Sequence, residues 1–289
     1  MILVDYSGIA IATLFAQGSN PRNLEEGLIR HQILNTLRAY NVKFRKEYGQ
    51  MILACDGGNT WRKQYFPEYK ASRKTSREES PVDWQEFYRI LNLVRDEIGE
   101  HIPFQVIHVQ GCEADDVIAV LAETTQEFGC GDKVMIVSSD KDFLQLQKYS
   151  NVKQFSPMKG KLLVSEDPIR ELREKILRGD SGDGIPNVLS GDKVFITEGA
   201  RQTPVTAKKI DNWLSNYEHL QEQMTPEIYR NFIRNQNLIH LGQIPQEVQE
   251  TIIDNFKTVT PASKSKVLNY LVSKRCAMLV QSASEFFAE

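Results

Sequence analysis

The stretch VMIVSSDKDF, residues 134–143, decides the fold, because four apolar residues give way there to a loop that carries Asp140 and Asp142. A short apolar run of this kind is typical of a buried strand, and the acidic pair follows at the end of that strand. Other carboxylates follow comparable apolar runs elsewhere in the chain: Asp5, Asp56, Glu113, Asp115 and Asp116. Because ligands of parallel sheets bind beyond the carboxyl ends of the strands, we expect these groups to meet in one crevice.

The clustered carboxylates predict a metal site. Unpaired acidic groups repel one another, and an all-oxygen ligand set suits magnesium or manganese rather than zinc. The motifs EADD at 113–116, DKD at 140–142 and GDSGD at 179–183 each offer carboxylates with one or two residues between them, and the last adds Asp180 and Asp183. A single such residue is ordinary, since Asp and Glu often cap the next helix. The whole set indicates two ions, which activate water and stabilise both oxygens of a phosphodiester displacement.

The hydrophobic pattern predicts an α/β fold with a mainly parallel central sheet flanked by helices. Strands are expected at 1–5, 51–55, 104–109, 133–138 and 151–155, with helices near 24–40, 83–99 and 114–128. After about residue 165 the strand signals fade, and helices are expected near 167–178, 205–217, 226–238, 245–256 and 263–282. We therefore expect an α/β domain over 1–165 and a helical subdomain over 166–289.

Composition sets further bounds. Lys and Arg total 35 against 38 Asp and Glu, so any nucleic-acid interface must come from local clusters of charge. The four cysteines, Cys55, Cys112, Cys130 and Cys276, show no metal-binding spacing and are expected to stay reduced. The first residues lack a basic start and contain Asp5, which argues against a signal peptide, and no apolar stretch is long enough to span a bilayer. We expect a soluble, cytoplasmic monomer.

A basic and aromatic segment, WRKQYFPEYKASRKTSREES at 61–80, follows Asp56 closely. Its cations are Arg62, Lys63, Lys70, Arg73, Lys74 and Arg77. Interleaved rings such as Tyr69 can stack on bases while the cations meet phosphates, as in single-strand binding. A solvated basic loop is the alternative. Because these cations follow an anionic metal cluster, a phosphate backbone is the species that would bridge both.

Six motifs occur in an order typical of one known superfamily: VDYSGIA at 4–10, EYKASR at 68–73, EADD at 113–116, SSDKDF at 138–143, NVKQFSPM at 151–158 and KILRGDSGDGIPNV at 175–188. On these motifs the chain resembles the flap endonuclease or 5′-nuclease superfamily, which has a PIN-like fold, and within it the ribonuclease H of T-even-type phages. The motifs cover most of residues 1–190, and the resemblance is weaker beyond them.

The resemblance assigns roles to individual residues. It implies a first metal held by Asp5, Asp56, Glu113 and Asp115, and a second held by Asp140, Asp142 and Asp183, with Asp180 acting through water. Asp116 would support this set. The metals would be two Mg²⁺, with Mn²⁺ as a substitute. Residues 61–82 would form a mobile arch, in which Lys70 and Arg73 contact the scissile phosphate and Tyr69 stacks on a base.

Residues 176–217 resemble the start of a helix-three-turn-helix, a duplex-binding motif that often holds a potassium ion. The match departs at VLSGDKVFITEGARQTPVTAKKI, residues 188–210, which lacks the compact glycine turn and the Lys-Thr-Ala run. This departure puts a K⁺ site in question. The cations here, Lys193, Arg201, Lys208 and Lys209, are still expected to grip phosphates, with Thr206 as the cap of the next helix.

These observations predict a metal-dependent 5′ to 3′ nuclease that hydrolyses phosphodiesters near the 5′ end or 5′-flap junction of RNA/DNA and DNA/DNA duplexes. By resemblance it would remove RNA primers during phage DNA replication in the host cytoplasm, alongside a single-strand-binding protein and a sliding clamp. Two alternatives remain. One is a non-catalytic binder of branched nucleic acid. The other is a phosphoryl hydrolase of the DxD type, with a nucleophilic aspartate in DKD at 140–142.

Overall fold

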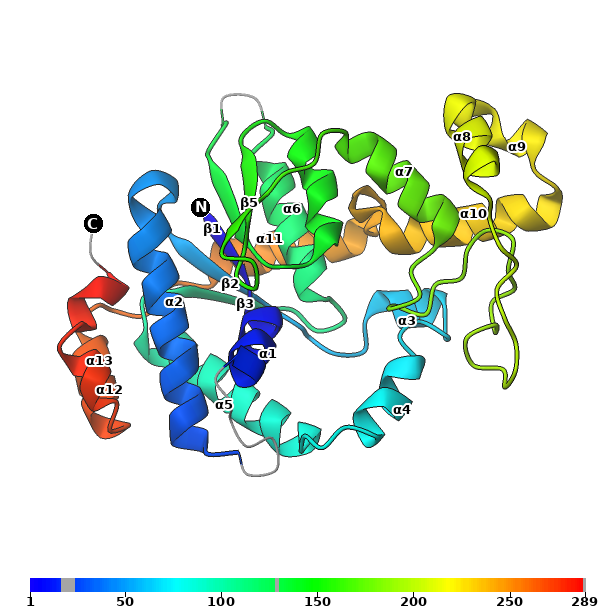
Figure 1. Ribbon diagram of the computed structural model, residues 1–289. Helices are drawn as coiled ribbons and strands as arrows, with labels where there is room; N and C mark the ends of the chain where they lie inside the picture. Colours follow the sequence, from blue (N-terminus) through cyan, green and yellow to red (C-terminus); the bar gives the residue numbers. More distant parts are fainter. Residues whose placement is uncertain (17–23, 128–129, 288–289) are drawn as a thin grey trace.

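The computed structural model describes residues 1–16, 24–127 and 130–287, and its centre is a six-stranded sheet (Figure 1). The strands are β1 (Ile2–Asp5), β2 (Met51–Cys55), β3 (Gln105–His108), β4 (Val134–Val137), β5 (Val152–Ser156) and β6 (Lys161–Leu163). Their order is β3-β2-β1-β4-β5-β6, and only the β5–β6 pair is antiparallel. The predicted α/β fold is confirmed. Strand β6 was missed, because its three residues are largely exposed and carry no alternation.

Helices cover both faces of the sheet. The N-terminal part contributes α1 (Tyr6–Ala16), α2 (Glu26–Tyr48), α3 (Trp61–Tyr65), α4 (Ser72–Glu78), α5 (Trp84–His101), α6 (Ala114–Thr124) and the 3₁₀ helix η1 (Lys141–Lys148). Ile2 and Val4 of β1 pack with α1, α2 and α5 on one face, whereas Leu3 packs with α6 on the other. Successive strand residues point to opposite faces, so a strand buried on both sides is apolar throughout.

The chain after β6 is helical, as expected. Its elements are α7 (Pro168–Arg178), α8 (Ala207–Ser215), η2 (Tyr217–His219), α9 (Leu220–Gln223), α10 (Pro226–Ile239), η3 (Leu241–Gln243), α11 (Gln246–Thr258), α12 (Lys266–Ser273), α13 (Ala277–Val280) and η4 (Ala283–Phe286). Figure 1 shows α8 and α9 at the opposite end of the molecule from α12 and α13. Helix α11 packs on α6, and α12 packs beside α5, so both return to the cores of the sheet. The division at residues 165 and 166 stays a prediction.

Three predicted helices differ from those observed. The helix predicted near 24–40 continues to Tyr48, where α2 ends. The helix predicted at 263–282 is broken, because Arg275 adopts a left-handed backbone conformation (φ 55°) and the Cys276 N–H donates to the Leu271 carbonyl. This hydrogen bond ends α12 in the manner of a Schellman cap, usually marked by a glycine that this sequence lacks. The helix predicted at 114–128 ends at Thr124, and residue 128 lies outside the described residues. No helix in the described ranges is long and apolar enough to cross a membrane.

Candidate functional site

The topology brings the strand-end carboxylates together. Strand β1 lies between β2 and β4, so the strand order reverses at β1, and a crevice opens beyond the carboxyl ends of these strands. Asp5 ends β1, Asp56 follows β2 and Asp140 follows β4. Burial above all, together with the negative charges of Asp56 and Asp140, raises the pKa of Asp5 to about 6. The crevice therefore concentrates negative charge.

Neutral donors hold the first carboxylates in place. The Gly8 N–H donates to Asp5 Oδ1 (2.8 Å) and the Ser138 hydroxyl donates to Oδ2 (2.9 Å). A Cβ at Gly8 would lie 2.3 Å from Asp5 Oδ2, so the glycine in VDYSGIA leaves room for this carboxylate. Asp56 accepts from the Ala114 N–H (3.0 Å) at the start of α6, where the helix dipole favours an anion.

The first turn of α6 separates two acidic residues that look equivalent in the sequence. Burial raises the pKa of Asp115 well above its usual range, and the carboxylates of Asp140 and Asp5 add to the effect. Within the part of the chain that the structure describes, the Asp115 carboxylate makes no hydrogen bond or ion pair. Asp116 points the other way and is fully buried. It accepts from the Glu113 N–H (2.9 Å) and pairs with Arg62 (2.8 Å).

Three expectations therefore do not fit the structure. Asp116 is occupied by a capping box and by Arg62, so it is not free to bind a metal. Arg62, only 3% exposed, also pairs with Glu113 (3.0 Å) instead of facing a phosphate. Tyr69, only 2% exposed, places its hydroxyl 3.0 Å from both Glu113 and Asp183, so its ring cannot stack on a base in this conformation. A basic and aromatic segment has the same sequence pattern whether its side chains face solvent or are buried against carboxylates.

Two residues of the predicted arch, both candidates for a catalytic role, contact carboxylates of the site. Lys70 Nζ lies 2.6 Å from Glu113 Oε1 and 3.6 Å from Asp183 Oδ2, and Arg73 pairs with Asp183. Burial lowers the pKa of Lys70, but the charges of Glu113 and Asp183 outweigh it and leave the pKa raised. Burial likewise raises the pKa of Glu113, yet Lys70 and Arg62 bring it below its usual range. Both partners are therefore charged.

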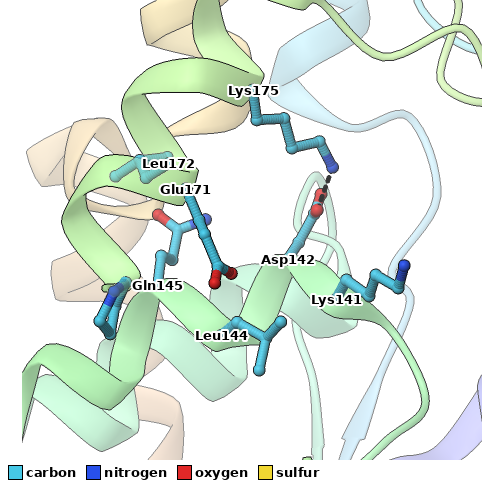
Figure 2. A pocket seen from close by; sticks show the side chains of 8 residues that line it. Lys141, Asp142, Leu144, Gln145, Glu171, Leu172 and Lys175 are labelled. Carbon is cyan, nitrogen blue, oxygen red and sulfur yellow. Dashed lines mark hydrogen bonds and ion pairs between the residues drawn. The ribbon is translucent and has the colours of Figure 1, made fainter. Parts of the chain in front are cut away.

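The other side of the crevice contains a residue that the sequence analysis missed. Lys175 of α7 contacts Asp142 of η1 and lies 2.7 Å from Asp180 Oδ2 (Figure 2). Burial raises the pKa of Asp142 to about 6, against the attraction of Lys175. Burial also opposes ionisation of Asp180, but Lys175 lowers its pKa overall. The signal was present in KILRGD, where a lysine precedes Asp180 by little more than one helical turn.

The donor set fits hard divalent cations. It consists of carboxylate oxygens at one sheet edge, with pKa values of about 6 for Asp5 and Asp142 and with Asp115 unpaired. Among the described residues, no three acidic, histidine or cysteine side chains already converge as a metal shell. Lys70, Arg73 and Lys175 pair with the carboxylates that face them, so binding a metal requires these ion pairs to rearrange.

A cleft of about 660 Å³ adjoins the carboxylates on the side of the predicted arch. Asp56 and Glu113 line it together with four cations: Lys63, Lys70, Arg73 and Arg77. Lys63 and Arg77 are exposed, and the Arg77 guanidinium lies 5.2 Å from the centre of the Tyr88 ring. Of the remaining predicted contacts, the Lys74 side chain lies outside what the structure describes.

The predicted duplex-binding element is a helix, a long loop and a helix, formed by α7, residues 179–206 and α8. Thr206 caps α8 as expected, and its four cations, Lys193, Arg201, Lys208 and Lys209, are exposed. The carbonyls of Pro186 and Val188 accept from the side chains of Arg234 (2.8 Å) and Asn231 (3.0 Å). Each of these carbonyls therefore already accepts a side-chain hydrogen bond.

The sheet, its switch-point crevice and the cations beside it are the features of a 5′-nuclease, and two family models agree. One, described as the 5′-3′ exonuclease N-terminal resolvase-like domain, matches residues 1–174, and another, described as the T4 RNase H C-terminal region, matches residues 168–286. The chain belongs to the 5′-3′ exonuclease family.

Three individual proteins are similar to this chain in sequence or in fold. The chain is 31% identical to ribonuclease H of Enterobacteria phage T4, over 98% of this chain and 95% of that protein. It is 30% identical to a 5′-3′ exonuclease of Aquifex aeolicus, over 77% of this chain and 75% of that protein. The D15 protein of phage T5, solved with metal ions, has a similar fold, with a TM-score of 0.61 at 18% identity over 89% of this chain and 98% of that one.

Proposed function

We propose that this 5′-nuclease uses two divalent cations, Mg²⁺ or in its place Mn²⁺, to cut near the 5′ end or 5′-flap junction of RNA/DNA and DNA/DNA duplexes. The observation that carries the proposal is the half-buried Asp115, which has no ion-pair partner among the described residues and lies near Asp5, on the same crevice as Lys70 and Arg73. Carboxylates without counter-ions fit metals, and the neighbouring cations fit a phosphate. Phage T4 ribonuclease H, and a phage T5 flap endonuclease solved in a complex with DNA and metal ions, support this reading.

Seven carboxylates would hold the ions, with Asp180 acting through water: Asp5, Asp56, Glu113, Asp115, Asp140, Asp142 and Asp183. When bound, the ions supply an activated water and stabilise the oxygens that enter and leave. Lys70 and Arg73 bind the scissile phosphate and neutralise the charge that develops on it. To do so they exchange their contacts with Glu113 and Asp183 for contacts with the phosphate.

Substrate selection rests on shape. Lys63 and Arg77 line the cleft that would receive an unpaired 5′ strand, and the exposed cations of residues 193–209 meet duplex phosphates. Phosphate contacts position a nucleic acid without reading its bases. Binding should therefore weaken steeply as the salt concentration rises. The biological role that we propose is removal of RNA primers in phage DNA replication, with a single-strand-binding protein and a sliding clamp as the implied partners of a cytoplasmic monomer.

Cleavage of a 3′-labelled 5′-flap duplex tests the proposal, with magnesium, calcium or chelator and beside a blunt hairpin that has no free 5′ end. We expect magnesium-dependent cleavage near the junction, with the hairpin spared. In the variant Asp140→Asn, cleavage should be lost while flap binding in calcium persists. Tight binding without cleavage in the native protein would favour the non-catalytic binder. Phosphate release from small esters, independent of Lys70, would favour the DxD-type hydrolase.

A further inference from the structure

Lys175 occupies the space between two carboxylates of the proposed metal site. Its ammonium contacts Asp142 and lies 2.7 Å from Asp180 Oδ2, and Figure 2 shows the contact with Asp142 reaching from α7 to η1. A divalent ion cannot bind to both of these oxygens while the ammonium lies between them. The lysine stem is flexible, and its head group is a compact point charge, so the ammonium can move without a change in the backbone.

A second carboxylate lies on the same helix as Lys175. Glu171 lies four residues before Lys175 on α7, and both side chains line a cavity of about 160 Å³ between α7 and η1. In Figure 2 the Glu171 carboxylate points toward η1 and away from the Lys175 ammonium. Among the described residues, the Glu171 side chain makes no hydrogen bond or ion pair. A glutamate four residues before a lysine is the favourable order for a helical ion pair.

We propose that Lys175 is an internal counter-ion that holds Asp142 and Asp180 together in the metal-free protein and moves to Glu171 when a divalent cation binds. The inference rests on the proposed function, since it requires Asp142 to bind the metal directly and Asp180 to bind it through water. Lys175 would then be a positioning residue. It keeps the two acids close before loading, and it sets the cation concentration at which the site fills.

Calcium binding measured by titration calorimetry, without nucleic acid, tests this role. Lys175→Met should bind Ca²⁺ roughly tenfold more tightly at the site, because the competing charge is gone. Lys141→Met is the matched control, since Lys141 lines the same cavity but pairs with neither acid; its effect should be less than about twofold. Lys175→Arg should bind calcium more weakly, because a guanidinium bridges two carboxylates better than an ammonium.

Glu171→Gln tests the second position, and its calcium affinity should fall by about twofold because the displaced ammonium loses its partner. Equal or weaker calcium binding by Lys175→Met would overturn the proposal, as would an equal gain in Lys141→Met. If Lys175→Met does not fold without metal, Lys175→Gln, which keeps a polar group between the acids, takes its place. Failure of the native protein to bind any divalent cation would instead contradict the proposed function.

Discussion

The two halves of the carboxylate cluster are neutralised differently. The strand-end half, Asp5, Asp56 and Asp140 with Asp115 of α6 beside them, receives only neutral hydrogen bonds or none. The cation-paired half, Glu113, Asp142, Asp180 and Asp183, contacts Lys70, Arg73 or Lys175. The paired half is therefore compensated by the fold itself. The carboxylates of the strand-end half repel one another, and only protonation or an added cation relieves this repulsion. A metal is therefore needed most at the centre of the sheet.

Removing the least compensated charge should have the largest effect on activity. Asp115→Asn should lower cleavage of a 5′-flap duplex by at least about a thousandfold, because a proposed metal ligand is lost. The same change should raise the thermal midpoint of the metal-free protein, since a half-buried carboxylate without an ion-pair partner disappears. Cleavage assays test the expected loss of activity, and thermal unfolding in chelator tests the expected rise of the midpoint. Retained cleavage would remove Asp115 from the site.

Breaking the buried cation pairs should chiefly affect folding. Arg62→Met leaves Asp116 and Glu113 buried without their guanidinium, so the free energy of unfolding should fall by roughly 3–5 kcal/mol. Lys63→Met, at the exposed neighbouring position, should change it by less than about 0.5 kcal/mol. Urea denaturation compares the two variants. An equally small effect of both substitutions would show that Arg62 does not neutralise Asp116 and Glu113.

The cradle of Asp5 can be disturbed without changing any charge. Gly8→Ala would place a methyl group 2.3 Å from Asp5 Oδ2 and push the carboxylate out of position. We expect a loss of flap cleavage of about a hundredfold, the usual scale for a small misplacement of a reacting group. Gly27→Ala is the control, because a Cβ there meets nothing within 4 Å and α2 gains helix propensity. Equal activity of the two variants would contradict a strict geometric role for Asp5.

The smallest effect concerns pH. The pKa values of Asp5 and Asp142 are raised from 3.8 to about 6, so between these values the folded protein holds protons that the unfolded chain has released. The metal-free protein should therefore lose stability as pH rises from about 4 through about 6, by on the order of 1 kcal/mol or more for each group. Denaturant midpoints in chelator at pH 5 and 7.5 measure this loss, and added calcium should reverse it at pH 7.5. A higher midpoint in chelator at pH 7.5 would contradict it.

Sequence reasoning succeeded in placing residues that lie at the end of an element. Asp5, Asp56 and Asp140 follow apolar runs, and parallel strands bring such positions to one edge. Sequence reasoning failed where the role of a residue depends on the direction in which its side chain points. Asp115 and Asp116 are adjacent in the chain, yet consecutive residues of a helical turn point about 100° apart, so one faces the crevice and the other is a cap. Tyr69 and Arg62 are likewise turned toward buried carboxylates in this structure, a direction that the basic and aromatic pattern does not contain.

The sequence by itself determined the α/β class, the helical C-terminal part and the acidic edge, because hydrophobic periodicity and strand exits are local properties of the chain. Tertiary structure alone decided which carboxylates have counter-ions. Lys175 lies on a helix 33 residues from Asp142, and Lys70 lies 43 residues from Glu113, so only packing brings each pair together. Whether a cation neutralises a carboxylate depends on the distance between the two charges in the folded protein, and the order of residues in the chain does not give that distance.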